Sequence, residues 1–570
     1  MRKRSVIILS ITFMLCGCSN QQPLSETQKL ESLARVWGFL KYYHPSVGSG
    51  KTDWDSDFIQ ILPKVKAAQS KEELSAVYLE WIEGLEKVKK VVPETKGKEP
   101  AIGWADGLGI WGENGPVTKE KTFDKNFNLD WTDDKSLFSE KLISKLDYIE
   151  KNRFRGKIRY GTFNPAVFSN STKEATGAIQ NMKSPNEASR LLTLFTYWNL
   201  IEYFFPYKYQ TDQDWNEVLT EMIPRFKDAE SVSEYHLTVV EMVAKVNDSH
   251  ASISPEYAPE VFGSYWIPAR FKLIDGKAVI KGFLNDSMAI ADDIKVGDIV
   301  YKVNGEDISD IVRRESKYIS ASNEDGKRRN FFNAVFNGMT DNVTVTLERD
   351  GLVQEKQLKR YLFEDFGYKP GAKGVKWEVL NGNIGYVNMG LLKPADVAEM
   401  MESLMKCRAI IFDIRNYPQL TMREVTKYLN PGPRPFAKIM KPDSTYPGKY
   451  FWSDIQLAGE QNASPYRGKV VILVNEHTQS QAEYTVMALQ TADSATVIGS
   501  QTAGADGNVV YFELPGGIRT RISGLGVFYP DGRETQRIGI VPDIEVKPTI
   551  EGIRNRRDEV LEKALEFVER

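Results

Sequence analysis

Residues 469–490, KVVILVNEHTQSQAEYTVMALQ, decide the fold of the C-terminal part of this 570-residue chain. They begin with a continuous apolar run, which is typical of a strand buried on both faces of a parallel sheet. A polar turn follows, and then Ser480 and Glu483 open a segment with helical spacing. Serine followed by glutamate three residues later is a capping box, whereas serine at a strand-to-helix turn has the placement of a nucleophile. The local sequence leaves both interpretations open.

The flanking sequence extends this pattern into an α/β domain. A second apolar run, RAIIFDIR at 408–415, predicts another buried strand with a helix after it. A Gly-rich β-like segment covers about 504–526, and a charged helix begins near Arg557. Strands that alternate with helices favour a parallel sheet.

Four short motifs in this region carry a family resemblance. They are Ser-x-x-Glu opening a helix, GSxTxG at 499–504, LPxG at 514–517 and GIVPDI at 539–544. Together they resemble the catalytic core of the C-terminal-processing (tail-specific) serine peptidases and of tricorn. The resemblance implies a multidomain α+β protein with an α/β ClpP/crotonase-like peptidase core. It also implies a serine endopeptidase that uses no cofactor and no metal.

The segment before this core changes to short β-like runs between about 256 and 362. Residues 296–306, VGDIVYKVNGE, resemble the second half of a PDZ domain, although no Gly-Leu-Gly-Phe carboxylate loop is visible. PDZ domains bind peptide ends by strand addition. With this segment the family resemblance covers roughly residues 190–570.

The resemblance assigns the nucleophile and its base. The serine of Ser-x-x-Glu is the family's nucleophile, which carries over to Ser480. Processing peptidases use a lysine base about 25 residues later, but residues 503–507 read AGADG. Tricorn-like members use a Ser-His pair before the PDZ-like region, where Ser249-His250 stands. The resemblance therefore implies His250 as the base and Ser249 as its orienting partner.

The physical requirement agrees with that assignment. A serine hydroxyl near pH 7 needs a base of matched pKa, and imidazole titrates near 6.5. We therefore expect activity to rise through an apparent pKa of about 6.5. An isolated histidine is also commonly a packing residue. His477, three residues before Ser480, is an alternative base, although a turn residue so close in sequence usually faces solvent.

Two positions depart from the family pattern. Gln536 stands where the family has a polar Glu, three residues before the Gly of GIVPDI, and Glu534 lies two residues earlier. The family's oxyanion segment, Asp-x-Arg-x-Asn-x-Gly-Gly, is DIRNYPQ at 413–419 here. Pro418 has no N–H, so we expect Gln419 or a neighbour, together with the N–H of Gln481, to serve as oxyanion donors.

An internal repeat precedes the PDZ-like segment. An offset of 161 residues without gaps aligns Trp37 with Trp198, and the dipeptide Asp53-Trp54 with Asp214-Trp215. Apolar residues recur at helical spacing in both copies, which predicts two helical hairpins. Lys89 of the first copy aligns with His250, so only the second copy carries the Asp-Ser-His group.

The N-terminus has the pattern of a secretory signal. Three basic residues precede an apolar run and the sequence Leu15-Cys16-Gly17-Cys18. This ending resembles the bacterial lipobox, which implies that Cys18 is lipidated; in a plain signal peptide it would be an ordinary residue. We expect a lipid-anchored protein of the bacterial cell envelope, facing the periplasm or the cell exterior.

Charge and cysteine content exclude other classes of protein. Without residues 1–17, 71 Lys and Arg face 77 Asp and Glu, for a net charge of −6, which disfavours nucleic acid as a partner. Cys407 is then the only cysteine besides Cys18, so neither an intramolecular disulfide nor a cysteine-based zinc site is expected once Cys18 is lipidated.

The expected domain boundaries follow from these patterns. They are 1–17 signal peptide, 18–90 first helical copy, 91–187 intervening segment, 188–255 second copy, 256–362 PDZ-like domain and 370–570 peptidase core. The expected function is hydrolysis of peptide bonds in peptides or proteins outside the cytoplasm. Two alternatives remain: a peptide-binding lipoprotein of the same fold without activity, and a hydrolase of another acyl substrate.

Overall fold

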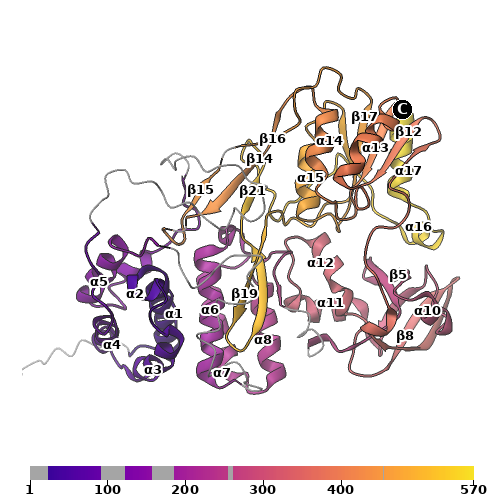
Figure 1. The fold of residues 1–570 in the computed structure, drawn as a ribbon. Coiled ribbons are helices and arrows are strands. Elements are labelled where there is room, and N and C mark those ends of the chain that lie inside the picture. The colour runs from indigo at the N-terminus through magenta and orange to yellow at the C-terminus, as the bar shows by residue number, and fades with distance from the viewer. Residues whose placement is uncertain (1–22, 92–121, 157–184, 254–260, 444, 454) are drawn as a thin grey trace, which may run out of the picture.

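The computed structural model describes residues 23–91, 122–156, 185–253, 261–443, 445–453 and 455–570 (Figure 1). The predicted lipidation site Cys18 and much of the intervening segment therefore lie outside the described residues. Across the described ranges, no helix has the length and apolar character needed to cross a membrane.

Helices build the N-terminal half, at the left of Figure 1. They are α1 (Glu26–Tyr43), α2 (Pro45–Gly48), α3 (Trp54–Ala67), α4 (Lys71–Glu83), α5 (Glu140–Lys151), α6 (Glu187–Phe204), α7 (Trp215–Asp228) and α8 (Val232–Ala244). The bounds of α1, α3 and α4 differ from those of α6, α7 and α8 by 161 residues at both ends. Each copy is a three-helix unit rather than a hairpin, because a capping serine, Ser70 or Ser231, starts a third helix.

Both copies contain the same pair of tryptophans, and they differ at the position where the first helix of one copy crosses that of the other. The indole N–H groups of Trp37 and Trp54 each donate to the other residue's carbonyl, and Trp198 and Trp215 do the same. Where α1 crosses α6, a Cβ on Gly38 would lie 1.8 Å from the Asn199 side chain, so only glycine fits. Gly38 and Asn199 are themselves related by the 161-residue offset.

The segment between 265 and 362 forms an antiparallel sheet with the strand order β4-β5-β6-β8-β9, and β4 lies at one edge. Its strands are β4 (Ala269–Ile274), β5 (Lys277–Phe283), β6 (Ile299–Val303), β7 (Glu306–Asp307), β8 (Asn342–Arg349) and β9 (Leu352–Lys359), with β3 (Tyr265–Trp266) and β10 (Tyr361–Leu362) paired beside them. Its helices are α10 (Asp286–Ala291), α11 (Ile308–Glu315) and α12 (Glu324–Asn330). We call this unit the β domain.

The C-terminal core, at the upper right of Figure 1, is a six-stranded sheet with the order β11-β12-β13-β17-β18-β22. All neighbours in it are parallel except β11 and β12. The strands are β11 (Trp377–Leu380), β12 (Ile384–Asn388), β13 (Ala409–Asp413), β17 (Lys469–Val474), β18 (Ala495–Gly499) and β22 (Ile544–Glu545), and the helices are α13 (Val397–Leu404), α14 (Met422–Leu429), α15 (Gln481–Leu489), α16 (Ile550–Arg554) and α17 (Glu559–Glu569). The two predicted buried strands are β13 and β17, at the centre of this sheet.

Two smaller sheets connect the core to the helices. One joins β1 (Thr122–Phe123), β14 (Arg434–Pro442), β15 (Tyr450–Trp452), β16 (Gln456–Ala458) and β21 (Gly526–Phe528). The other has the order β19-β20-β2, from Val509–Leu514, Ile518–Ser523 and Ser252–Ile253. In this sheet Ser252 of β2 pairs with Arg521 of β20. His250, two residues before β2, therefore lies opposite the end of β20 at Ser523.

Candidate active site

Ser480 lies at the turn between β17 and α15, as the sequence predicts. Its backbone is strained, with φ 58° and ψ −125°, a conformation that non-glycine residues rarely adopt. A strained serine between a strand and a helix is the geometry of a nucleophile elbow, and the helix N-terminus adds free N–H groups beside the side chain.

Glu483 holds this turn against the neighbouring loop 502–505. Its buried carboxylate accepts the Ser480 N–H at 3.1 Å, the Gly504 N–H at 2.8 Å and the Ala505 N–H at 3.1 Å. Burial raises the pKa of Glu483, while the Thr502 hydroxyl and these N–H groups oppose the rise. The capping role predicted for Glu483 is therefore present, and it extends beyond the helix to the adjacent loop.

His250 is buried and belongs to a hydrogen-bonded chain of three residues. Its Nδ1 lies 2.8 Å from the Ser523 hydroxyl, which donates to the Asp248 carboxylate at 3.0 Å. Asp248 also accepts the backbone N–H groups of Ser523 and His250. Because the Ser523 proton is directed to Asp248, Nδ1 must be the donor to Ser523, which leaves Nε2 unprotonated and free to accept a proton.

Ser249 does not orient the imidazole as the family pattern implied. Its hydroxyl donates to the Ala503 carbonyl at 2.9 Å and accepts the Ser322 N–H at 2.9 Å. Its own N–H donates to the Ser322 hydroxyl. The hydrogen bonds of the Ser249 hydroxyl are therefore made to the core and to the β domain. Ser523, and not Ser249, contacts the imidazole of His250.

The His250 segment and the Ser480 turn meet across loop 502–505. Ser249 bonds to Ala503, while the Ser480 N–H also lies 3.0 Å from the Ala505 carbonyl. The Gln479 side chain donates to the Ser249 carbonyl at 3.1 Å. Within the described residues no hydrogen bond joins the His250 ring directly to Ser480; in free enzymes such catalytic hydrogen bonds are often long and tighten with substrate.

Gln536 and Glu534 have different surroundings. The Gln536 amide lies 3.3 Å from both Asp248 and Ser322, so it touches the chain of residues that holds His250. Glu534 instead accepts the Tyr209 hydroxyl at 2.8 Å and the Gln210 amide, on the helical side of the molecule. Of the two residues, the structure therefore places Gln536, and not Glu534, in contact with the residues that hold His250.

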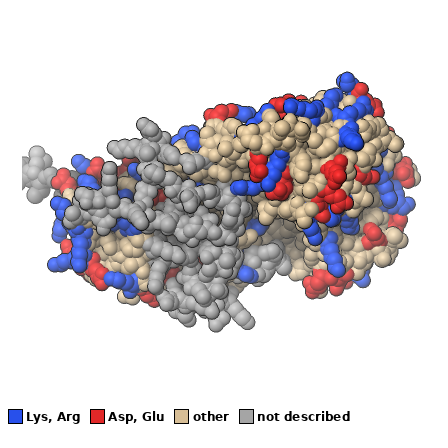
Figure 2. All heavy atoms as spheres, turned by 45° about the horizontal axis from the view of Figure 1, so that its top comes forward, with Lys and Arg blue, Asp and Glu red and all other residues tan. Residues whose placement is uncertain are grey.

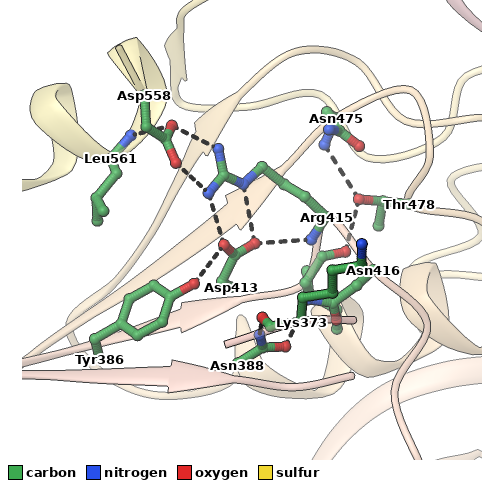
Figure 3. A network of polar contacts seen from close by, with 11 residues as sticks. Lys373, Tyr386, Asn388, Asp413, Arg415, Asn416, Asn475, Thr478, Asp558 and Leu561 are labelled. Carbon is green, nitrogen blue, oxygen red and sulfur yellow. Dashed lines mark hydrogen bonds and ion pairs between the residues drawn. The ribbon is translucent and has the colours of Figure 1, made fainter. Parts of the chain in front are cut away.

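The loop after β13 is fixed by a charge network at the carboxyl end of that strand (Figure 3). Arg415 bonds to Asp413 at 2.6 Å and to Asp558, the N-cap of α17, at 2.7 Å, and the Tyr386 hydroxyl donates to Asp413. The Thr478 hydroxyl donates to the Ile414 carbonyl, which ties this loop to the turn that carries Ser480.

The predicted oxyanion donors are only partly brought to the nucleophile. The N–H of Gln481 follows Ser480 directly at the helix start. The Gln419 side chain is exposed and donates to the Gly390 carbonyl at 2.8 Å, away from Ser480. Tyr417 lies two residues before Gln419; burial raises its pKa, and the nearby Ser480 and Gln481 oppose that rise.

His477 faces a cavity between the core and the β domain. The cavity has a volume of about 750 Å³, and its lining includes Trp266, Phe271, Lys281, Arg329 and His477. Ser480 is not among the described residues that line it. Desolvation and the nearby charge of Lys281 lower the pKa of His477, although 44% of its side chain stays exposed. The structure therefore gives His477 a place in this cavity rather than against the nucleophile.

Sequence reasoning missed Ser523. Ser523 lies in the segment SGLGV, which carries no motif, and its contact with His250 depends on the pairing of β2 with β20.

Comparison with known proteins identifies the core. Residues 383–546 match the family model described as Peptidase family S41. The core of this chain is a peptidase family S41 domain. A curated relative from Staphylococcus haemolyticus, described as a probable CtpA-like serine protease, is 25% identical over 212 residues, which are 36% of this chain. The match spans 40% of the length of that relative.

The fold also resembles solved structures. The structure of mature CPAF complexed with lactacystin has a TM-score of 0.54 and 15% identity, over 67% of this chain and 98% of that chain. A second structure of mature CPAF has a TM-score of 0.52, over 66% and 96% of the two chains. At this identity the likeness establishes the S41 peptidase-like fold, with mixed helices and sheets.

Proposed function

We propose that this protein is a serine endopeptidase in which Ser480 is the nucleophile and His250 the general base. The observation that carries the proposal is the meeting of two elements, the strained Ser480 turn and the buried Asp248–Ser523–His250 chain, across loop 502–505. Membership of the core in family S41 and the similarity to a CtpA-like protease support the reaction class.

The reaction follows the general logic of acyl transfer. The Ser480 oxygen attacks the carbonyl carbon of the peptide bond while His250 Nε2 takes the hydroxyl proton. The carbonyl oxygen becomes an oxyanion, which the Gln481 N–H stabilises. The C–N bond then breaks as Nε2–H protonates the leaving amine, and water repeats the sequence on the acyl-enzyme with the same base.

Asp248 and Ser523 position the base rather than react. The Ser523 hydroxyl fixes Nδ1 as the protonated nitrogen, and the Asp248 charge favours the imidazolium that forms during attack. Gln536 supplies an amide to the same carboxylate. A neutral amide fits there because Asp248 already provides the negative charge.

The β domain is proposed to be a PDZ-like module that presents the substrate. Its edge strand β4 borders the cavity that His477 lines, so an extended peptide end could add to the free edge. Lys272 of β4 forms an ion pair with Glu476, which links this edge to the turn before Ser480. Lysine and arginine on the cavity wall suit the negative carboxylate of a peptide end.

Peptides or proteins are the proposed substrates, and nucleic acid is not. On the face drawn in Figure 2, positive and negative side chains are interspersed over the described surface rather than gathered in one basic patch. The lipobox-like sequence supports a lipid anchor at Cys18 and a location in the bacterial cell envelope. Mass spectrometry of the mature N-terminus tests this, since an unmodified start at another residue would contradict it.

The test of the proposed activity compares the wild-type protein with Ser480→Ala on a mixed peptide library. Cleavage by the wild type and none by the variant, with an unchanged far-UV circular dichroism spectrum, is the expected result. Failure of the wild type to cleave any peptide while it still binds peptides would favour the non-catalytic alternative. Turnover of esters alone would favour a hydrolase of another acyl substrate.

A further inference from the structure

The cavity that His477 faces, between the core and the β domain, has an excess of positive charge. Six lysine and arginine side chains line it, against the three carboxylates of Asp275, Asp325 and Glu476. Asp275 is exposed at the turn between β4 and β5, where solvent screens its charge. Desolvation lowers the pKa of His477, so this side chain adds no positive charge near neutral pH. A peptide end with a single carboxylate would therefore leave part of the cavity's charge unbalanced.

Three of the six cations already have a carboxylate partner. Lys272 forms an ion pair with Glu476. Arg328 lies 3.1 Å and Lys547 3.3 Å from the Asp325 carboxylate. These pairs fix the walls of the cavity, and they leave the remaining three cations available to a ligand.

Lys281 is one of these three, and an irregularity in its strand directs it into the cavity. Arg270 of β4 pairs with Gly282 of β5, whereas the next residue, Phe271, pairs with Ile280. Lys281 is thus the extra residue of a β-bulge, a feature that changes the direction of a side chain. Its ammonium lines the cavity and makes no hydrogen bond or ion pair with any residue that the structure describes.

Arg270 and Arg329 are the other two cations. The Arg270 guanidinium lies against Gly282, the residue after Lys281, since a Cβ on this glycine would be 2.9 Å from a guanidinium nitrogen. Arg329 of α12 donates to the Glu476 carbonyl at 2.8 Å, which places it at the turn before Ser480. Neither guanidinium forms an ion pair with a carboxylate of the described residues. Three cations without counter-ions therefore line one cavity.

The charge environment of Lys281 agrees with this geometry. Desolvation lowers the pKa of its ammonium to about 8; the negative charge of Glu476 opposes the decrease, and the positive charges of Lys272 and Arg270 add to it. The group is still charged near neutral pH, but it lacks negative neighbours. A carboxylate beside it would form a charge-assisted hydrogen bond.

Aromatic rings form the apolar part of the same cavity. The Trp266 ring lies 6.0 Å from that of Phe332 and 5.0 Å from that of Phe363, and all three line the cavity. Phe332 is 53% and Phe363 43% exposed, so both rings are open to a ligand. Exposed rings beside cations suit a peptide with apolar and acidic side chains better than a small inorganic anion.

We propose that the cavity selects peptide ends that carry an acidic side chain in addition to the terminal carboxylate, and that Lys281 determines this specificity. The inference rests on the proposed function, because it names which peptides the site takes. The terminal carboxylate balances one of the three free cations, and the glutamate or aspartate side chain balances Lys281. The turn that lines the cavity with Glu476 and His477 also carries Ser480, so a peptide bound here leads toward the nucleophile.

The test measures peptide binding to the full-length Ser480→Ala protein by fluorescence anisotropy, so that cleavage does not interfere. The two probes are fluorescein-labelled alanine peptides with a free C-terminal carboxylate, one ending in Leu-Glu-Leu and the other in Leu-Gln-Leu. The glutamate peptide is expected to bind about tenfold or more tightly than the glutamine peptide. Adding Lys281→Met should bring the two Kd values close to each other, whereas Lys281→Arg should retain the preference.

The matched control is Lys277→Met on the same strand. The Lys277 ammonium lies 5.2 Å from the centre of the Tyr301 ring and does not line the cavity. This variant should keep the full preference for glutamate. The Kd of the glutamine peptide provides a second control, because a correctly folded Lys281→Met protein should bind that peptide as before.

Three results would overturn the proposal: equal affinity for the two probes, no detectable binding of either, or a preference that Lys281→Met leaves intact. If amidation of the peptide end weakens binding while the change from glutamate to glutamine does not, the cavity holds only the terminal carboxylate. Failure of the proposed nucleophile gives a different result. Cleavage by Ser480→Ala at the wild-type rate would remove Ser480 from the mechanism without changing the effect of Lys281→Met on binding.

Discussion

The two helical copies have the same architecture but different ends. In each copy a pair of tryptophans exchanges indole N–H bonds with carbonyls, and three helices have matching bounds. The first copy ends in exposed lysines, Lys87 and Lys89. At the equivalent positions the second copy has Asp248 and His250, both buried against β20. Only the second copy therefore carries the residues to which we assign the chemistry.

This difference suggests how the site is assembled. The strand that follows His250 pairs with β20, which brings Ser523 to the imidazole. The first copy packs through α1 on α6 and α7 and so supports the second copy, and its Tyr43 hydroxyl donates to the Pro447 carbonyl between β14 and β15. The same helical unit thus supports the second copy in one place and carries the proposed base in the other.

The largest expected effect comes from the aligned pair His250 and Lys89. His250→Ala should lower kcat by about 10⁴- to 10⁶-fold, as loss of a base that acts as one unit with the nucleophile does in serine proteases. Lys89→Ala should leave kcat unchanged. Steady-state kinetics on a cleaved peptide measures both. A strong loss in Lys89→Ala would show that the first copy takes part in the chemistry.

The positioning residues should give an intermediate effect. Asp248→Asn and Ser523→Ala should each lower kcat by about 10²- to 10⁴-fold, because the imidazole loses its fixed tautomer. Lys87→Ala, at the position equivalent to Asp248, is the matched control and should have no effect. Kinetics together with thermal unfolding separates loss of catalysis from loss of folding. Near-normal kcat in Ser523→Ala would remove Ser523 from the site.

The dependence of kcat/KM on pH tests whether His250 of the second copy is the base. Burial lowers the pKa of His250 to about 4, and the Asp248 charge only partly opposes this. The base must be neutral to accept a proton, so kcat/KM should rise with pH through this lower value and be flat near pH 6.5. This expected limb lies below the value of about 6.5 for an unperturbed imidazole. A limb at or above pH 6.5 would show that His250 is not buried in the active state.

Much of the fold could be predicted from local sequence. The strands β13 and β17 are continuous apolar runs, and the 161-residue offset gives matching helices because the same capping and apolar residues recur. The position of Ser480 followed from the same pattern. These features depend on residues that are close together in the sequence, so the sequence alone is enough to predict them.

The contacts around the site could not be predicted in the same way. Ser523 reaches His250 only through strand pairing between segments about 270 residues apart. The Ser249 hydroxyl is bound by Ala503 of the core and Ser322 of the β domain, so its neighbours come from two other regions. No local pattern encodes such long-range distances.

The smallest effect should be shared by both copies. Trp54→Phe and Trp215→Phe each remove an indole N–H and leave a buried carbonyl without that donor. Each should lower the free energy of unfolding by about 1–3 kcal/mol, with similar values for the two copies and unchanged kcat. Urea unfolding measures the loss. Very different values would show that the two tryptophan pairs are not equivalent supports.

The central claim is that Ser480 is the nucleophile and that His250, rather than His477, activates it. Its most direct measurement is the rate of covalent labelling by a fluorophosphonate probe, with the labelled peptide mapped by mass spectrometry. The wild type should carry the label on Ser480, His250→Ala should be labelled at least about 10³-fold more slowly, and His477→Ala should be labelled at nearly the wild-type rate. A label on another residue, or normal labelling of His250→Ala together with loss in His477→Ala, would contradict the account.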